Sequence, residues 1–124
     1  MKPVATHLAP AAIGPYSQAI VHSGIVYCSG QIGLKSDGTW AGSDVRTQTR
    51  QCLQNLNQVL LEAGSATEGV IRATIFLADM ADFSVVNEEY GSYFGDHRPA
   101  RACIEASCLP KNARVEISCI AAVL

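Results

Sequence analysis

The stretch SDVRTQTRQCLQNLNQVLLEAG, residues 43–64, carries the clearest structural signal in this sequence. Its mainly apolar positions recur every three or four residues, the spacing of one α-helix face: Val45, Thr49, Cys52, Leu56, Val59 and Leu60. We expect Ser43 to cap this helix, Asp44 to lie in its first turn and Gly64 to end it. A helix that is apolar on one side must bury that side against another layer.

A second one-sided helix is predicted to begin at Asp82 and end at Gly95, with Phe83, Val86, Tyr90 and Phe94 along one face. The segments between and around the helices are rich in β-branched or alternating apolar residues, which is typical of strands. The predicted strands are Ala19–His22, Ile25–Ser29, Val70–Leu77, Arg101–Cys108 and Arg114–Val123, with a short extra strand at Val4–Thr6. This order predicts an α+β fold in which both helices cover one face of a single β-sheet.

The last two predicted strands are apolar at alternate positions, even in the first and odd in the second. If they form an antiparallel hairpin around residues 109–112, with Ala106 opposite Val115, their apolar side chains share one face. The other face, away from the helices, then gathers Arg101, Cys103, Glu105, Arg114, Glu116 and Ser118. We expect such a polar face to meet solvent or an interface.

Composition limits the function classes. With 124 residues and 48% hydrophobic residues, the chain is expected to form one domain spanning residues 1–124. A net charge of −2 disfavours nucleic-acid binding, and no apolar run reaches the 20 or so residues of a membrane span. The five cysteines are odd in number and lack a Cys-x-x-Cys pair. Together with an N-terminus that lacks a signal-peptide apolar region, this predicts reduced thiols and a cytoplasmic location.

Three residues near the C-terminus are candidates for chemistry, each with an alternative structural role. Arg101 could hold a carboxylate or phosphate with its planar fork, or form an ion pair with Glu105 or Glu116. Glu116 could activate a water molecule as a general base, or be an ordinary ion-paired glutamate. Cys103 could be a nucleophile, although no histidine forms a known Cys-His signature with it, or a packed thiol.

Metal and nucleotide sites have no support in the motifs. The three histidines lack metal-binding spacing, so no metal is expected. The glycines form no phosphate-binding loop, so no nucleotide cofactor is expected either. Gly30 and the turn that contains Tyr16 stand where a backbone donor or a tyrosine hydroxyl can approach a ligand, although ordinary turn chemistry also explains both.

Taken together, several segments resemble the Rid (reactive intermediate deaminase) family, also known as the YjgF or L-PSP endoribonuclease-like family, and within it the RidA subgroup. The resemblance covers nearly the whole chain in order, through Ala9–Ala19, Ser29–Ile32, Pro99–Cys103, Leu109–Lys111 and Val115–Ile117. It implies a chorismate-mutase-like fold and a homotrimer with inward-facing sheets and ligand clefts between subunits. It also implies hydrolysis of 2-imino acids, such as 2-iminobutanoate and 2-iminopropanoate, to 2-keto acids and ammonia without a cofactor.

The resemblance also implies roles for individual residues. Arg101 matches the arginine that grips the substrate carboxylate, and Glu116 matches the glutamate that positions the attacking water. Cys103 matches a cysteine whose backbone groups face the imine. The matches to pocket-lining positions are Tyr16, Ser29, Gly30 and Asn87.

This sequence departs from the family pattern around Gly95–Pro99, where the loop is shorter and Arg98 replaces a frequent aromatic residue. The additional cation could favour a more acidic substrate or pair with Asp96. Ala102 stands where serine or threonine is frequent.

Two alternatives to the deaminase remain open. One is an endoribonuclease that inhibits translation, an activity that four cations could serve locally: Arg98, Arg101, Lys111 and Arg114. The net negative charge and the lack of a paired-histidine site count against it. The other is a noncatalytic ligand-binding or chaperone-like trimer.

Overall fold

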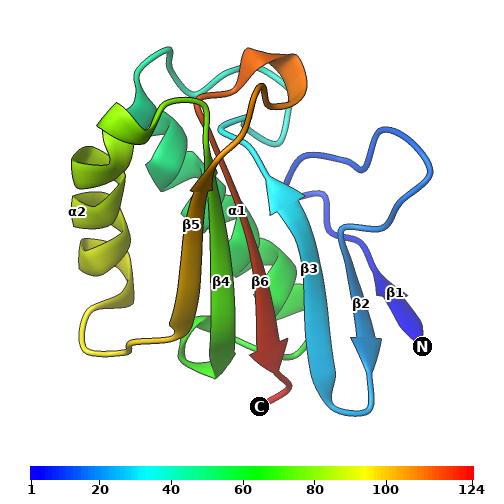
Figure 1. Ribbon diagram of the computed structural model, residues 1–124. Coiled ribbons are helices and arrows are strands. Elements are labelled where there is room, and N and C mark those ends of the chain that lie inside the picture. The colour runs from blue at the N-terminus through cyan, green and yellow to red at the C-terminus, as the bar shows by residue number, and fades with distance from the viewer.

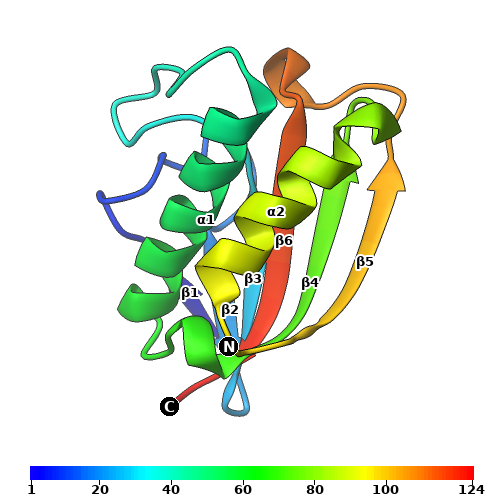
Figure 2. The ribbon, with the colours of Figure 1, turned by 90° about the vertical axis from the view of Figure 1, so that its left-hand side faces the viewer.

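A computed structural model describes residues 1–124. It contains one six-stranded sheet in the order β1-β2-β3-β6-β4-β5, with helices α1 (Val45–Glu62) and α2 (Phe83–Phe94) on one face (Figures 1 and 2). The strands are β1 (Lys2–Val4), β2 (Ala19–His22), β3 (Ile25–Gln31), β4 (Val70–Leu77), β5 (Ala100–Glu105) and β6 (Val115–Ala122). The predicted α+β class, with two helices on one face of the sheet, is confirmed.

Strand positions agree closely with the sequence pattern, except at some ends. The ranges predicted for β2 and β4 are those observed, whereas β3 continues two residues further, to Gln31. β5 ends at Glu105 rather than Cys108, and β1 lies at residues 2–4 rather than 4–6. Short 3-10 turns occur at Thr67–Gly69, Met80–Asp82 and Pro110–Asn112.

The helix ends show which capping predictions hold. Asp44, not Ser43, caps α1, because its carboxylate accepts the Thr47 N–H at 2.9 Å. Gly64 (φ 81°) follows α1 and Gly95 (φ 61°) follows α2, both in backbone conformations that favour glycine. Neither helix is long and apolar enough to cross a membrane.

The predicted hairpin between the last two strands is wrong. β5 lies at the edge of the sheet and pairs in parallel with β4, while β6 is inserted between β3 and β4 (Figure 1). The connection from β4 through α2 accounts for the parallel pairing, since a helical crossover returns the chain in the same direction. Instead of facing Val115, Ala106 donates its N–H to the Leu77 carbonyl at 2.8 Å. Alternation identifies the two faces of each strand but not its neighbour.

The predicted shared polar face is therefore also wrong. Ala73 is directly opposite both Arg101 and Cys119, and it is buried beneath the helices. Arg101 and Cys103 consequently belong to the helix-covered face. Glu116 is opposite Phe76 and belongs to the other, open face.

The core fills the space between the sheet and the two helices. Its fully buried side chains come from both layers and include Val26, Leu53, Ile75 and Ile117. The helices are also joined to one another through Glu89, whose carboxylate accepts hydrogen bonds from Arg46 at 2.6 Å and Arg50 at 2.8 Å. These bonds fix α2 against α1.

A buried amide ties α1 to the loop that follows β3. Asn55 is 1% exposed, and its Nδ2 donates to the carbonyls of Ile32 at 3.2 Å and Leu34 at 2.8 Å. The Ile32 carbonyl also accepts the Leu34 N–H at 2.9 Å, whereas Asn55 is the donor to the Leu34 carbonyl, so Asn55 completes the hydrogen bonding of this loop.

Replacing Asn55 with alanine is expected to lower the free energy of unfolding by about 2 kcal/mol, because the buried Leu34 carbonyl loses its donor and the Ile32 carbonyl loses one of its two. Urea unfolding at pH 7 measures this loss. Gln54→Ala is the matched control, since Gln54 is exposed on the same helix and makes no side-chain hydrogen bond. Equal stability of the two variants would contradict the role assigned to Asn55.

Candidate functional site

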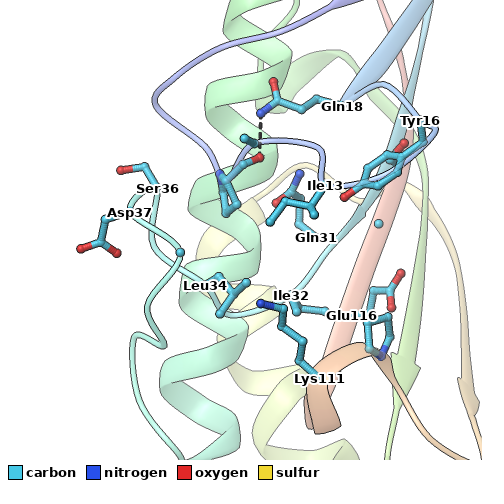
Figure 3. Close-up of a pocket in the computed structure, with 16 residues that line it drawn as sticks. Ile13, Tyr16, Gln18, Gln31, Ile32, Leu34, Ser36, Asp37, Lys111 and Glu116 are labelled. Carbon is cyan, nitrogen blue, oxygen red and sulfur yellow. Dashed lines mark hydrogen bonds between the residues drawn. The ribbon is translucent and has the colours of Figure 1, made fainter.

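A cavity of about 720 Å³ opens beside the end of β3 and the start of β6 (Figure 3). Its walls come from the segment before β2, the loop after β3, the turn at Pro110 and Lys111, and β6. Four of the residues proposed from the sequence line it together: Tyr16, Ser29, Gly30 and Glu116.

Glu116 is the one acid among these four residues. It is half-buried and forms no salt bridge. Burial raises the pKa of its carboxyl group above the ordinary value. An ionised glutamate in this environment is a stronger base than an exposed one, as a residue that activates water requires. The ion-pair alternative for Glu116 is therefore wrong.

Gly30 makes room for this carboxyl group. A Cβ atom at position 30 would lie 2.9 Å from Cδ of Glu116, closer than real Cβ contacts allow. Any side chain at this position would displace the carboxyl group from the cavity wall. Gly30 is thus required by close approach rather than by its φ angle.

Ser29 and Tyr16 belong to one hydrogen-bonded corner of the cavity. The Ser29 hydroxyl donates to the Ser17 carbonyl at 2.6 Å, and the Ser29 N–H donates to the Gln18 carbonyl at 3.0 Å. Tyr16 is held beside them and is 53% exposed, with its ring at the rim of the cavity (Figure 3). Its hydroxyl is available to a ligand.

Gln18 is a structural residue of this site that the sequence pattern did not reveal. It is 3% exposed, and its amide accepts the Thr6 N–H and donates to the carbonyls of Thr6 and Pro10. Gln18 therefore fixes the N-terminal wall as Asn55 fixes the loop after β3. An isolated glutamine before a short strand gives no periodic signal that could have identified it.

Arg101 lies outside this cavity, on the exposed edge strand β5. Its Nη1 donates to Oδ1 of Asn87 on α2 at 2.7 Å. Its Cζ lies 5.0 Å from the Tyr90 ring centroid and 5.7 Å from that of Phe83. No carboxylate forms a salt bridge with it, so the ion-pair alternative is wrong.

The acids expected near Arg101 are engaged elsewhere or too distant. Glu105 accepts the Met80 N–H at 2.8 Å. The alternative pairing of Arg98 with Asp96 is wrong too, because Arg98 donates to the His97 carbonyl and forms no salt bridge. The guanidinium of Arg101 is exposed, held in place and not neutralised, which are the properties of an anion site.

Cys103 is two residues along β5 from Arg101, on the same face. It is half-buried, and burial raises the pKa of its thiol. This disfavours the thiolate that a nucleophilic cysteine needs. The geometry fits a packed thiol, with the backbone of this edge strand left accessible. All five cysteines are free.

Arg101 and Glu116 do not meet within one chain. They point to opposite faces of the sheet, and their strands β5 and β6 are separated by β4. Two strand spacings amount to about 10 Å before the thickness of the sheet is added. A ligand of four carbon atoms cannot bridge both side chains of one copy.

No group of three or more His, Cys, Asp or Glu side chains is placed to bind a metal ion. His97, the one histidine with a side-chain hydrogen bond, contacts the Val70 carbonyl at 2.7 Å. The candidate residues offer a guanidinium without a carboxylate partner, in Arg101 on β5, and a half-buried carboxyl group, a tyrosine and backbone groups at the cavity.

Comparison with known proteins identifies the family of this chain. Residues 6–123 match the family described as Endoribonuclease L-PSP. The chain belongs to this family, the Rid/YjgF/L-PSP family. The resemblance inferred from the sequence is confirmed.

Two curated members of the Rid/YjgF/L-PSP family are named for a deaminase activity. The 2-iminobutanoate/2-iminopropanoate deaminase of Mus musculus is 46% identical over 121 residues, which cover 97% of this chain and 90% of the mouse protein. The chloroplastic Reactive Intermediate Deaminase A of Arabidopsis thaliana is 45% identical over 95% of this chain and 64% of its own length. These relatives are named as enzymes.

A solved structure of the Rid/YjgF/L-PSP family has the same fold. The crystal structure of E. coli TdcF with bound serine superposes with a TM-score of 0.94 at 36% identity, covering 98% of each chain. A family member of this shape thus holds a small amino acid.

Glu116→Gln is expected to raise the thermal midpoint at pH 7, because the amide removes a partly buried charge. The raised pKa means that the folded state binds a proton more readily than the unfolded state does. The stability contributed by protonation of Glu116 is therefore fully present below the pKa that this group has in the unfolded state. It is lost as the pH rises through the higher pKa of the folded state. The advantage of Gln should shrink as the pH falls through this window.

Thermal unfolding at a series of pH values from neutral down to the ordinary carboxyl range tests this expectation. Glu62→Gln is the control, since Glu62 is exposed and makes no side-chain hydrogen bond or salt bridge. A lower midpoint for Glu116→Gln at pH 7 would mean that the carboxylate makes a net favourable interaction, which would contradict the destabilising effect of its burial.

Proposed function

We propose that this protein is a 2-iminobutanoate/2-iminopropanoate deaminase, which hydrolyses 2-imino acids to 2-keto acids and ammonia. The observation that carries the proposal is the guanidinium of Arg101, which is held by Asn87 and two aromatic rings and has no carboxylate partner. Such a group is suited to the carboxylate that these substrates share. The names of relatives about 45% identical over nearly the whole chain support the same reaction.

The proposed reaction depends more on the positions of the substrate and the attacking water than on strong acid or base catalysis. The imine carbon is electrophilic, so a substrate fixed by its carboxylate needs a well-placed water molecule. Glu116 accepts a proton from this water as its oxygen attacks the imine carbon. Glu116 returns this proton to the imine nitrogen, which gives a neutral carbinolamine. Transfer of the carbinolamine hydroxyl proton to the nitrogen, again through Glu116, then expels ammonia, leaves the carbonyl of the 2-keto acid and restores the carboxylate. One water is consumed and one ammonia released, with no oxidant or cofactor.

The remaining site residues have supporting roles in this proposal. Tyr16, Ser29 and Gly30 line the cavity beside Glu116 and would shape the space around the imine. Asn87 orients Arg101 through the bond at 2.7 Å. Cys103 would contribute backbone groups rather than its thiol, because the raised thiol pKa makes it a poor nucleophile.

We further propose that the site is completed between copies of the chain in a homotrimer. Arg101 and Glu116 lie on opposite faces of the sheet, so a substrate that contacts both must lie between an edge strand of one copy and the cavity of another. The open face of the sheet is not covered by helices (Figure 2) and carries half-exposed apolar residues, among them Tyr27 and Ile104. Such a face suits an interface. The cytoplasmic location stays a prediction.

The endoribonuclease alternative finds less support. Three of the four cations considered for RNA binding are engaged by different groups of the chain. Arg101 faces α2, Lys111 lines the cavity beside Glu116, and Arg114 is paired with Asp82 at 2.9 Å. Continuous backbone tracking of a nucleic acid needs cations along one path.

Replacing Arg101 with alanine should lower kcat/KM for imine hydrolysis by about 100-fold, since the substrate loses its anchor and its alignment. A threonine dehydratase generates 2-iminobutanoate in the assay, and the formation of 2-oxobutanoate above the spontaneous rate is followed. Arg98→Ala removes a nearby cation and serves as the control, with activity expected to be retained. Wild-type activity in Arg101→Ala would reject this mechanism, and no acceleration by wild type would reject the function.

Mixing two inactive variants tests whether the site is shared. Arg101→Ala and Glu116→Gln subunits are unfolded together, refolded together and assayed. If each cleft takes Arg101 from one subunit and Glu116 from the next, random mixing of equal amounts leaves about a quarter of the clefts with both residues intact. About a quarter of the wild-type activity should therefore return. Each variant refolded alone is the control. A mixture as inactive as its components would show that both residues must come from one subunit or that the copies do not associate.

A further inference from the structure

The guanidinium of Arg101 is held by an unusual set of neutral partners, all from α2. Phe83, Asn87 and Tyr90 are spaced four and three residues apart, which places them on one side of the helix. The two aromatic rings lie 5.7 and 5.0 Å from Cζ of Arg101, and the Asn87 amide oxygen accepts from Nη1. We call these three residues the α2 cradle.

We propose that Phe83 and Tyr90 are positioning residues, which hold Arg101 so that its Nε and Nη2 edge receives a planar carboxylate. This proposal rests on the proposed function, because it assigns the residues that prepare its carboxylate anchor. Neither Phe83 nor Tyr90 contacts the reacting atoms. They act through the arginine.

The free hydrogen-bond donors of Arg101 indicate which edge is available. Asn87 occupies Nη1, while Nε and Nη2 have no acceptor in the chain. The Nε and Nη2 donors point in parallel and match the two oxygens of a carboxylate. Because the aromatic rings attract the cation without accepting these N–H groups, the cradle orders the side chain and leaves the fork open.

An acidic residue could order Arg101 equally well, but it would prevent the arginine from binding a ligand carboxylate. It would occupy the same fork and neutralise the charge, and a ligand carboxylate would then have to displace it. The contrast appears on the other side of α2, where Glu89 accepts from both Arg46 and Arg50 and fixes two arginines in a structural role. Neutral aromatic partners are therefore the chemically suitable support for an arginine that must bind an anion.

The rings themselves are firmly held. Tyr90 is 6% exposed and packs against Phe94 at a centroid distance of 4.5 Å, and Phe83 is half-buried at the start of α2. The hydroxyl of Tyr90 is buried and has no hydrogen-bond partner. The ring of Tyr90, not its hydroxyl, is what supports Arg101, so phenylalanine should replace it in this role.

The test measures the binding of 2-oxobutanoate, a carboxylate of the product class, by titration calorimetry, together with steady-state kinetics. Phe83→Leu should raise the Kd for 2-oxobutanoate and the KM for the imine about five-fold. The turnover number should change little, because the carboxylate contact is present in both ground and transition states. Phe83→Tyr should restore both constants to near wild-type values, and Tyr90→Phe should bind as wild type does.

The outcomes separate this proposal from the proposed function. An unchanged Kd and KM in folded Phe83→Leu would overturn the positioning role of the α2 cradle. Binding of 2-oxobutanoate by Phe83→Tyr that is as weak as binding by Phe83→Leu would overturn it too. Binding of 2-oxobutanoate that depends on Phe83 in a protein that fails to hydrolyse the imine would support the cradle and reject the deaminase. Absence of binding by wild type would overturn the cradle. Tyr90→Leu is not used, because it removes a core side chain and would destabilise the fold. The test therefore depends on the Phe83 variants.

Discussion

The site depends on an arginine that is ordered without being neutralised. Arg101 gains its orientation from two aromatic rings and the amide of Asn87, so its positive charge is undiminished at the surface of an edge strand. A salt bridge would have stabilised the side chain at the cost of its capacity to bind an anion. The arrangement of α2 over β5 can be understood from this requirement, because α2 supplies all three partners.

The topology of the sheet separates the two charged groups of the site. The crossover through α2 brings β5 parallel to β4 at the edge of the sheet, while β6 lies between β3 and β4. As a result Arg101 faces the helices and Glu116 faces the open side, next to a cavity cleared by Gly30. Within one chain these two groups cannot both contact one small molecule, so association of copies becomes part of the proposed chemistry.

Local patterns in the sequence predicted most of the fold. The helical spacing around Leu56 and the alternation of the strands identified both helices and the helix-covered sheet. The hairpin could not be predicted correctly, because alternation determines the face of a residue such as Glu116 and leaves its strand neighbour open. The stacking of Arg101 on Tyr90 was also beyond reach, since it depends on the crossover geometry. Individual site residues came from the family resemblance rather than from spacing.

A crystal structure of the assembled protein with 2-oxobutanoate bound tests the shared, arginine-anchored site most directly. Both carboxylate oxygens of the ligand are expected within hydrogen-bond distance of Nε and Nη2 of Arg101 from one copy. The ligand carbonyl should then lie beside Glu116 and Gly30 of another copy, with a water molecule between it and the Glu116 carboxylate. A ligand bound entirely by residues of one copy, or with its carboxylate away from Arg101, would contradict the proposed site.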